Sequence, residues 1–184
     1  MKKILLISLA VLLSFCYING QTAGWKIAGD KITTPWAQKV NPLNPLPEYP
    51  RPQMVRNEWK NLNGIWDYSI TAANESMPKV FQGKILVPFA VESALSGVGK
   101  PVGPDNLLWY RTKFTIPSTF KKKNILLHFG AVDWSSDIYI NGVMAGSHKG
   151  GYDPFFFDIT AFKQWLDAVK LEGESCEVVR AIIG

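Results

Sequence analysis

The chain has 184 residues, of which 47% are hydrophobic and 19% charged, so it can form one globular domain and lacks the composition of a disordered protein. The formal net charge is +5, and two of those charges, Lys2 and Lys3, lie in a segment that we expect to be removed. The remaining positive charge is small and forms no basic stripe, which argues against a nucleic-acid-binding protein.

The first residues have the pattern of an export signal. Two lysines precede the apolar run 4–16, which is too short for a membrane-spanning anchor. We therefore expect residues 1–20 to be a signal peptide and the mature protein to be periplasmic or secreted, without a transmembrane anchor. A lipoprotein anchored through Cys16 is the less favoured alternative, because the bulky Phe15 stands where a small residue normally precedes a lipidated cysteine.

Residues 21–48 are rich in proline and show neither helical nor strand periodicity. Proline fixes φ and removes a backbone donor, so this stretch is predicted to be an extended lead-in. Such a segment can lie along the surface of a partner. The pattern changes at Tyr49, and we expect residues 49–184 to form a β-sandwich.

Alternation of polar and apolar residues predicts short strands at residues 64–70, 84–87, 109–116, 124–129, 137–140, 143–146, 155–159 and 177–183. Asn141-Gly142 joins two of them and suits the positive-φ positions of a type I′ hairpin turn. Short strands separated by turn signals indicate an all-β, antiparallel sandwich. One short helix is expected at residues 162–169, where apolar side chains recur at helical spacing.

Four blocks of sequence resemble the N-terminal sugar-binding domain of glycoside hydrolase family 2, which includes β-galactosidases, β-glucuronidases and β-mannosidases. The blocks are "YPRPQMVRNEWKNLNGIWDY", "VPFAVESALSGVG", "LWYRTKFTIP" and "LLHFGAVDWSSDIYINGVMAGSHKGGYDPFFFDIT". Their order and spacing make the resemblance, over residues 49–160, more specific than one short motif. It implies a jelly-roll β-sandwich of the galactose-binding-domain type, followed in the family by an immunoglobulin-like domain and a (β/α)₈ barrel.

The resemblance also implies where catalysis occurs. The family hydrolyses glycosidic bonds with retention through two carboxyl groups on the barrel. A barrel needs about 250 residues, more than this chain contains. We therefore expect a carbohydrate-binding domain without catalytic residues, which leaves open whether the chain is an enzyme by itself. The alternatives are a self-standing secreted carbohydrate-binding module and a structural interaction domain, whose partners would be other glycosidase domains or further copies of the chain.

The tail departs from the family pattern. Residues 161–184 are longer than the usual connection, and Cys176 stands where the family usually has asparagine. The sequence therefore leaves open whether the last strand closes the sandwich in the normal way.

The loop "SHKGGYDPF" and the preceding Asp-Trp pair are the candidate binding residues. A sugar site combines carboxylates or amides with an aromatic surface, because buried hydroxyl groups without partners are costly. The candidates are Asp133, Trp134, His148, Lys149, Tyr152 and Asp153. By the resemblance, this loop leans toward the pocket of the barrel. The alternative is that Trp134 belongs to the core and Asp133 caps a turn.

Other chemistry-bearing residues are interpreted as structural. The mature chain keeps one cysteine and two histidines without metal-ligand spacing, so no metal or cofactor is expected. Asn57-Glu58 and Asn74-Glu75 look like the family's acid/base pair but lie in the lead-in and in a polar loop, so we expect surface roles. Asp158 suits a turn and Glu92 a loop contact. The remaining expectation is core packing for Trp59, Trp66 and Trp109.

Overall fold

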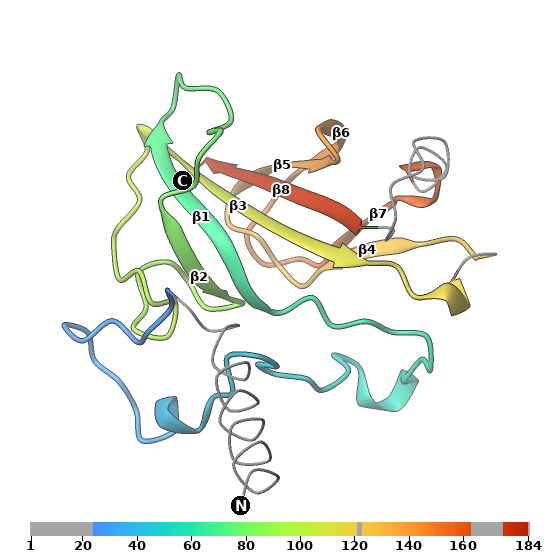
Figure 1. The fold of residues 1–184 in the computed structure, drawn as a ribbon, viewed down its shortest axis with the longest axis horizontal. Coiled ribbons are helices and arrows are strands. Elements are labelled where there is room, and N and C mark those ends of the chain that lie inside the picture. The colour runs from blue at the N-terminus through green and yellow to red at the C-terminus, as the bar shows by residue number, and fades with distance from the viewer. Residues whose placement is uncertain (1–23, 121–122, 163–174, 184) are drawn as a thin grey trace, which may run out of the picture.

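The computed structural model describes residues 24–120, 123–162 and 175–183, the last range by its backbone, and the predicted all-β class is confirmed (Figure 1). The strands are β1 (Gly64–Ala72), β2 (Gly83–Val87), β3 (Asn106–Thr115), β4 (Leu126–Phe129), β5 (Ser135–Ile140), β6 (Val143–Lys149), β7 (Phe155–Asp158) and β8 (Ser175–Ile183). Single-turn 3₁₀ helices are η1 (Ala37–Lys39), η2 (Pro52–Met54) and η3 (Ser118–Phe120). The expected signal peptide, Cys16 and all of the expected helix after residue 162 lie outside the described residues.

The strands form two antiparallel sheets. The large sheet has the order β2-β1-β3-β8-β5-β6, and the small sheet pairs β4 with β7. The last strand, β8, lies between β3 and β5, and Cys176 stands opposite Phe114 in the register. The unusual tail therefore completes the large sheet. The finer prediction of a jelly-roll connectivity stays a prediction.

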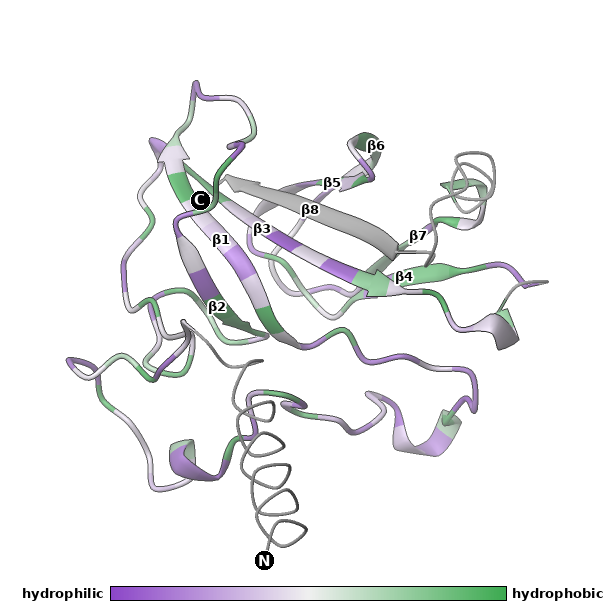
Figure 2. Ribbon diagram, viewed as in Figure 1, coloured by the Kyte–Doolittle hydropathy of each residue, from purple (hydrophilic) through white to green (hydrophobic). Residues whose placement is uncertain are grey.

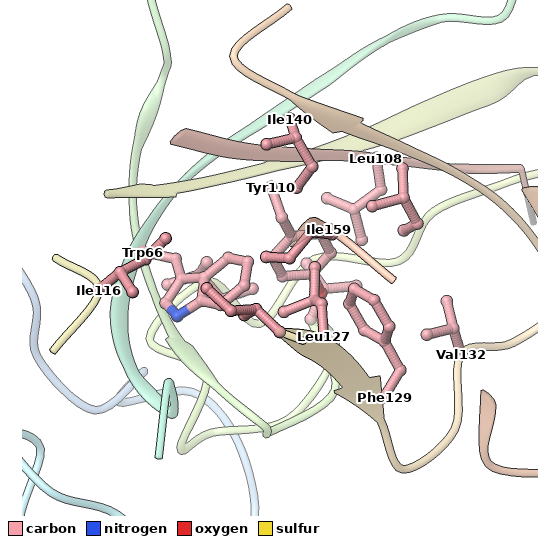
Figure 3. Packing of buried hydrophobic residues seen from close by; sticks show 13 residues of the cluster. Trp66, Leu108, Tyr110, Ile116, Leu127, Phe129, Val132, Ile140 and Ile159 are labelled. Carbon is pink, nitrogen blue, oxygen red and sulfur yellow. The ribbon is translucent and has the colours of Figure 1, made fainter. Parts of the chain in front are cut away.

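The core fills the space between the sheets because strand side chains alternate between two faces. The inward-facing residues of the large sheet meet Leu127 and Phe129 of β4 (Figure 3). They are Trp66, Ile85, Leu108, Tyr110, Ile138 and Ile140. Figure 2 shows hydrophilic bands in the middle of β1 and β3. Trp66 and Trp109 are both buried as predicted, but Trp109 packs with Leu107, Met77 and Phe81 in a second, smaller cluster.

The predicted hairpin between β5 and β6 is confirmed. Asn141 has φ of 51° and Gly142 has φ of 81°, as a type I′ turn requires. The turn fixes the pairing of the two strands and so determines which residues meet at their other end, where the candidate site lies.

The described part of the lead-in packs on the sandwich itself. The Trp25 indole Nε1 donates a hydrogen bond of 3.0 Å to the carbonyl of Ser96, and the Ala28 amide donates one of 3.0 Å to the carbonyl of Ala94. Further along, the Asn61 side chain donates to the carbonyl of Leu46 at 3.2 Å. Within the described residues, no helix is long and apolar enough to cross a membrane.

Asp67 on β1 accepts from two cations of neighbouring strands. Its carboxylate lies 2.5 Å from Lys84 Nζ of β2 and 3.0 Å from Arg111 Nη2 of β3. Partial burial raises the pKa of Asp67, but hydrogen bonds from Lys84 and Arg111, together with their charges, outweigh this and hold the pKa below its usual value.

The Asp67→Asn variant is expected to unfold about 1–2 kcal/mol more easily at pH 7, a value reduced by the partial exposure of the cations. Because the pKa of Asp67 is lowered in the folded state, the stabilisation is present above the ordinary carboxyl pKa of about 3.9 and is lost as pH falls. Urea unfolding from pH 7 to pH 3 measures it. The matched control is Asp30→Asn, since Asp30 is exposed. A stability difference that stays constant down to pH 3 would contradict the prediction.

Candidate functional site

The β5–β6 hairpin brings the Asp133-Trp134 pair next to the glycine-containing loop. Ser135 at the start of β5 stands opposite Lys149 at the end of β6. One step beyond this pair, the Gly150 amide donates a hydrogen bond of 2.8 Å to the carbonyl of Trp134. Residues that are about 15 positions apart in the chain therefore form one rim of the sandwich; this rim comprises residues 133–134 and 148–153.

Two carboxylates lie against the glycine backbone of the rim. A Cβ atom on Gly151 would lie 2.6 Å from Oδ1 of Asp133. A Cβ atom on Gly150, whose φ is 134°, would lie 2.5 Å from Oδ1 of Asp153. The positive φ of Gly150 favours glycine at that position. Asp133 and Asp153 therefore lie beside the same short loop.

His148 and Lys149 point to opposite faces of β6, as strand alternation requires. The His148 ring stacks on Phe155 of β7 with centroids 4.0 Å apart and 16° between the planes. Its Nε2 lies 3.3 Å from Oδ2 of Asp153, but this nitrogen is buried and makes no hydrogen bond within the described structure. Lys149 is exposed. The half-buried His148 therefore packs against the core through its ring, whereas the exposed side chain of Lys149 is accessible to a ligand.

Trp134 and Tyr152 present aromatic surface to solvent. Trp134 is 54% exposed and Tyr152 is 97% exposed, and Asp133 is also exposed. The alternative that Trp134 belongs to the core is wrong. Tyr152 lies in the same rim, but the described residues show no contact between its side chain and the other candidates. The rim thus offers aromatic surfaces, carboxylates and an ammonium group, which is the chemistry that binds hydroxyl-bearing rings.

The arrangement does not form a nucleophilic triad. Ser136, next to His148 in the strand register, is 1% exposed. Within the described residues its Oγ has no hydrogen-bond partner, and neither does His148 Nε2. A serine nucleophile needs a hydrogen bond to its base, so Ser136, His148 and Asp153 lack the required geometry. The described residues also contain no group of three or more metal-ligating side chains.

Two structural predictions have clear outcomes. The Asp158 carboxylate accepts from the Thr160 amide at 2.9 Å, and the hydrogen bonds from Thr160 lower the pKa of Asp158, so its predicted turn role is confirmed. Glu92, for which a loop contact was predicted, is exposed and makes no side-chain hydrogen bond in the described structure. The hydrogen bonds of the loop of residues 91–99 are made instead by Ser96, which the sequence analysis did not identify. A small polar residue within an otherwise apolar stretch is the sequence feature that could have indicated the role of Ser96.

A row of rings covers the outer face of the small sheet. Centroids lie 4.9 Å apart between Tyr49 and Trp59, 6.1 Å between Trp59 and His128, and 5.4 Å between His128 and Phe156. Trp59 is therefore half-buried in this row, so it packs as predicted, but against the outer face of the small sheet and not in the core. Partial burial lowers the pKa of His128, and the positive charges of two nearby arginines add to this effect.

Comparisons with known proteins agree with this fold. The chain is 44% identical over 54 residues to a β-galactosidase of Thermoanaerobacter pseudethanolicus, covering 29% of this chain and 7% of that protein. It is 28% identical over 109 residues to a β-glucuronidase of Streptococcus agalactiae, and the match covers 58% of this chain and 18% of that protein. Among solved structures, the β-glucuronidase of Ruminococcus gnavus in complex with D-glucuronic acid matches with TM-score 0.52 and 25% identity, over 71% of this chain and 23% of that one.

The chain thus spans less than a quarter of the length of these relatives. The family model described as "Glycosyl hydrolases family 2, sugar binding domain" matches residues 59–170, which is more than half of the chain. The matched range contains every strand of the described sandwich except β8, and it contains the whole rim. The chain therefore belongs to glycosyl hydrolase family 2 through its sugar-binding domain.

Proposed function

We propose that the chain is an exported carbohydrate-binding domain of a family 2 glycosidase and that its rim contacts the saccharide. The observation that carries the proposal is the exposed indole of Trp134 next to the Asp133 carboxylate, which lies close to the glycine loop. An indole face packs on the C–H face of a sugar ring, and a carboxylate accepts from its hydroxyl groups. Lys149, Tyr152 and Asp153 extend the same rim.

The hydrolytic step is assigned to another part of the full-length enzyme. The relatives are named β-galactosidase and β-glucuronidase, and they are several times longer than the matched region. Within this chain the rim carboxylates lie against glycine backbone, a geometry that fits positioning of a ligand. The apolar run in residues 4–16 supports export to the periplasm or beyond.

Saturable binding of the chain to a saccharide in a calorimetric titration of a glycan panel tests the proposal. Trp134→Ala and Asp133→Ala are each expected to weaken that binding by about tenfold. Trp36→Ala is the matched control, because Trp36 is also exposed, at 68%, but lies in the lead-in. Absence of binding across the panel, or equal weakening by the control, would contradict a rim site.

A second measurement separates binding from catalysis. The purified chain is expected to show no turnover of nitrophenyl glycosides. Robust turnover that one carboxylate substitution abolishes would overturn the assignment. Light scattering addresses the remaining alternative of a structural interaction domain, which requires a stable oligomer or complex and needs no glycan.

A further inference from the structure

A polar notch lies where the neighbouring strands β1 and β3 separate. Their pairing runs from Ala72 opposite Asn106 to Asp67 opposite Arg111 and then stops. In the described sheet, residues 64–66 pair with β2, and residues 112–115 pair with β8. Figure 1 shows the start of β1 and the end of β3 diverging. The cavity between them measures about 500 Å³ and includes residues 60–63 in its lining.

The hydrogen bonds of β1 show which backbone groups face the notch. Gln82, which precedes β2, bonds through its side chain to both the amide and the carbonyl of Ile70, and through its amide to the carbonyl of Tyr68. Even-numbered residues of β1 therefore direct their backbone groups toward β2. In an antiparallel strand the odd-numbered residues point the other way. The amide and carbonyl of Ile65 consequently face β3 across the notch.

The same alternation applies to β3. Lys113 is the residue that would continue the register opposite Ile65, but the two strands are not paired there. The Thr115 carbonyl, two residues further on, also faces the notch, because Lys60 Nζ reaches it at 2.7 Å. The notch is thus bordered by the backbone donors and acceptors of Ile65 and Lys113, which the described strands leave unpaired with each other.

Two lysines and two amides add charge and polarity at the mouth. Lys60 and Lys113 are exposed, and among the described side chains no carboxylate lies within ion-pair distance of either ammonium group. Glu177 of β8, described by its backbone, stands opposite Lys113 in the register. Lys60 uses one of its three donors on Thr115. The Asn61 side chain is held in place by the carbonyl of Leu46 and by the amide of Asn63. The notch therefore carries two lysine side chains and is largely preformed.

We propose that this notch binds an acidic saccharide of one or two rings. The cavity has the volume of a small-molecule site, which is about 300–1,000 Å³. Sugar hydroxyl groups complete the hydrogen bonds of Ile65 and Lys113, and the two ammonium groups bind the carboxylate of the sugar. The notch shares no residue with the rim, so the inference goes beyond the proposed function and stands independently of the rim site.

A saccharide fits better than an inserted peptide strand. The free backbone edges are short on each side, since the Thr115 carbonyl is already bonded to Lys60. An added strand is normally about five residues long and needs a ladder along its whole length. A sugar needs only a few directed hydrogen bonds and a counter-charge, both of which the notch supplies.

Titration of the isotope-labelled chain with sodium D-glucuronate, followed by amide NMR, tests the proposal. The amide signals of Ile65 and Lys113 are expected to shift saturably, and D-glucose is expected to bind at least tenfold more weakly. Lys60→Gln and Lys113→Gln are each expected to weaken glucuronate binding about tenfold. Lys79→Gln, an exposed lysine outside the notch, is the matched charge control and is expected to leave binding unchanged.

Three outcomes would overturn the proposal. One is the absence of a shift at Ile65 and Lys113 at millimolar glucuronate. Another is a shift confined to the rim, at residues 133–134 and 148–153, which would support the rim and reject the notch. The third is a response of the notch amides to an extended peptide but not to the sugar. Saturable notch shifts that survive Trp134→Ala would support the notch even if the rim binds nothing.

Discussion

The Gly146→Ala variant is expected to lose about 3 kcal/mol of unfolding free energy, because a methyl group has no room at this position. A Cβ atom on Gly146 would lie 2.3 Å from one ring carbon of Phe157 and 2.8 Å from another. Gly146 is on β6 and Phe157 is on β7, so this contact joins the large sheet to the small one. Chemical denaturation followed by tryptophan fluorescence measures the loss.

Gly130→Ala is the matched control, because a methyl group at that position would meet no described atom within 4 Å. It is expected to change stability by less than about 0.5 kcal/mol. Adding Phe157→Leu to Gly146→Ala is expected to recover part of the loss, since the smaller side chain can move away from the new methyl group. Equal unfolding free energies of Gly146→Ala and the unchanged chain would contradict the prediction, because they would mean that the two sheets can move apart to admit the methyl group without loss of stability.

The Ser96→Ala variant is expected to lose about 2–3 kcal/mol, because the Ser96 hydroxyl is the centre of a buried hydrogen-bond cluster. Its Oγ lies 2.9 Å from the carbonyl of Val91 and 2.8 Å from that of Ser93, and it accepts from the amide of Val98 at 3.0 Å. Ser96 is fully buried, so alanine leaves these groups without water. Thermal unfolding measures the change.

Ser93→Ala provides a graded control in the same loop. The Ser93 hydroxyl donates to the carbonyl of Ala90 at 2.7 Å, but it is partly exposed and water can replace it. Its loss is expected to stay below about 1 kcal/mol. The backbone carbonyl of Ser96 also accepts from Leu86 of β2 and from Trp25 of the lead-in. Ser96→Ala is therefore expected to increase amide exchange at Leu86, and unchanged exchange would contradict a role for Ser96 in fastening this loop.

The sequence by itself determined the elements whose signals are local. Period-two alternation located the strands of both sheets, because side chains of a strand must alternate between core and solvent. Asn141-Gly142 specified its turn, since few residues adopt positive φ without cost. The four blocks with family-like order also identified the correct family.

The tertiary structure decided everything that depends on which strands become neighbours. Alternation cannot tell which face of a strand is inside, so Trp134 was open to a core interpretation that its exposure refuted, and Trp59 proved to pack on the outer face of the small sheet. Strand order placed His148 on Phe155 and aimed Lys149 outward, although the two are adjacent in the chain. The notch arises because β1 and β3 separate to pair with different neighbours, β2 and β8. Such pairing depends on backbone hydrogen bonds between segments that are distant in the sequence, so no local sequence pattern predicts it.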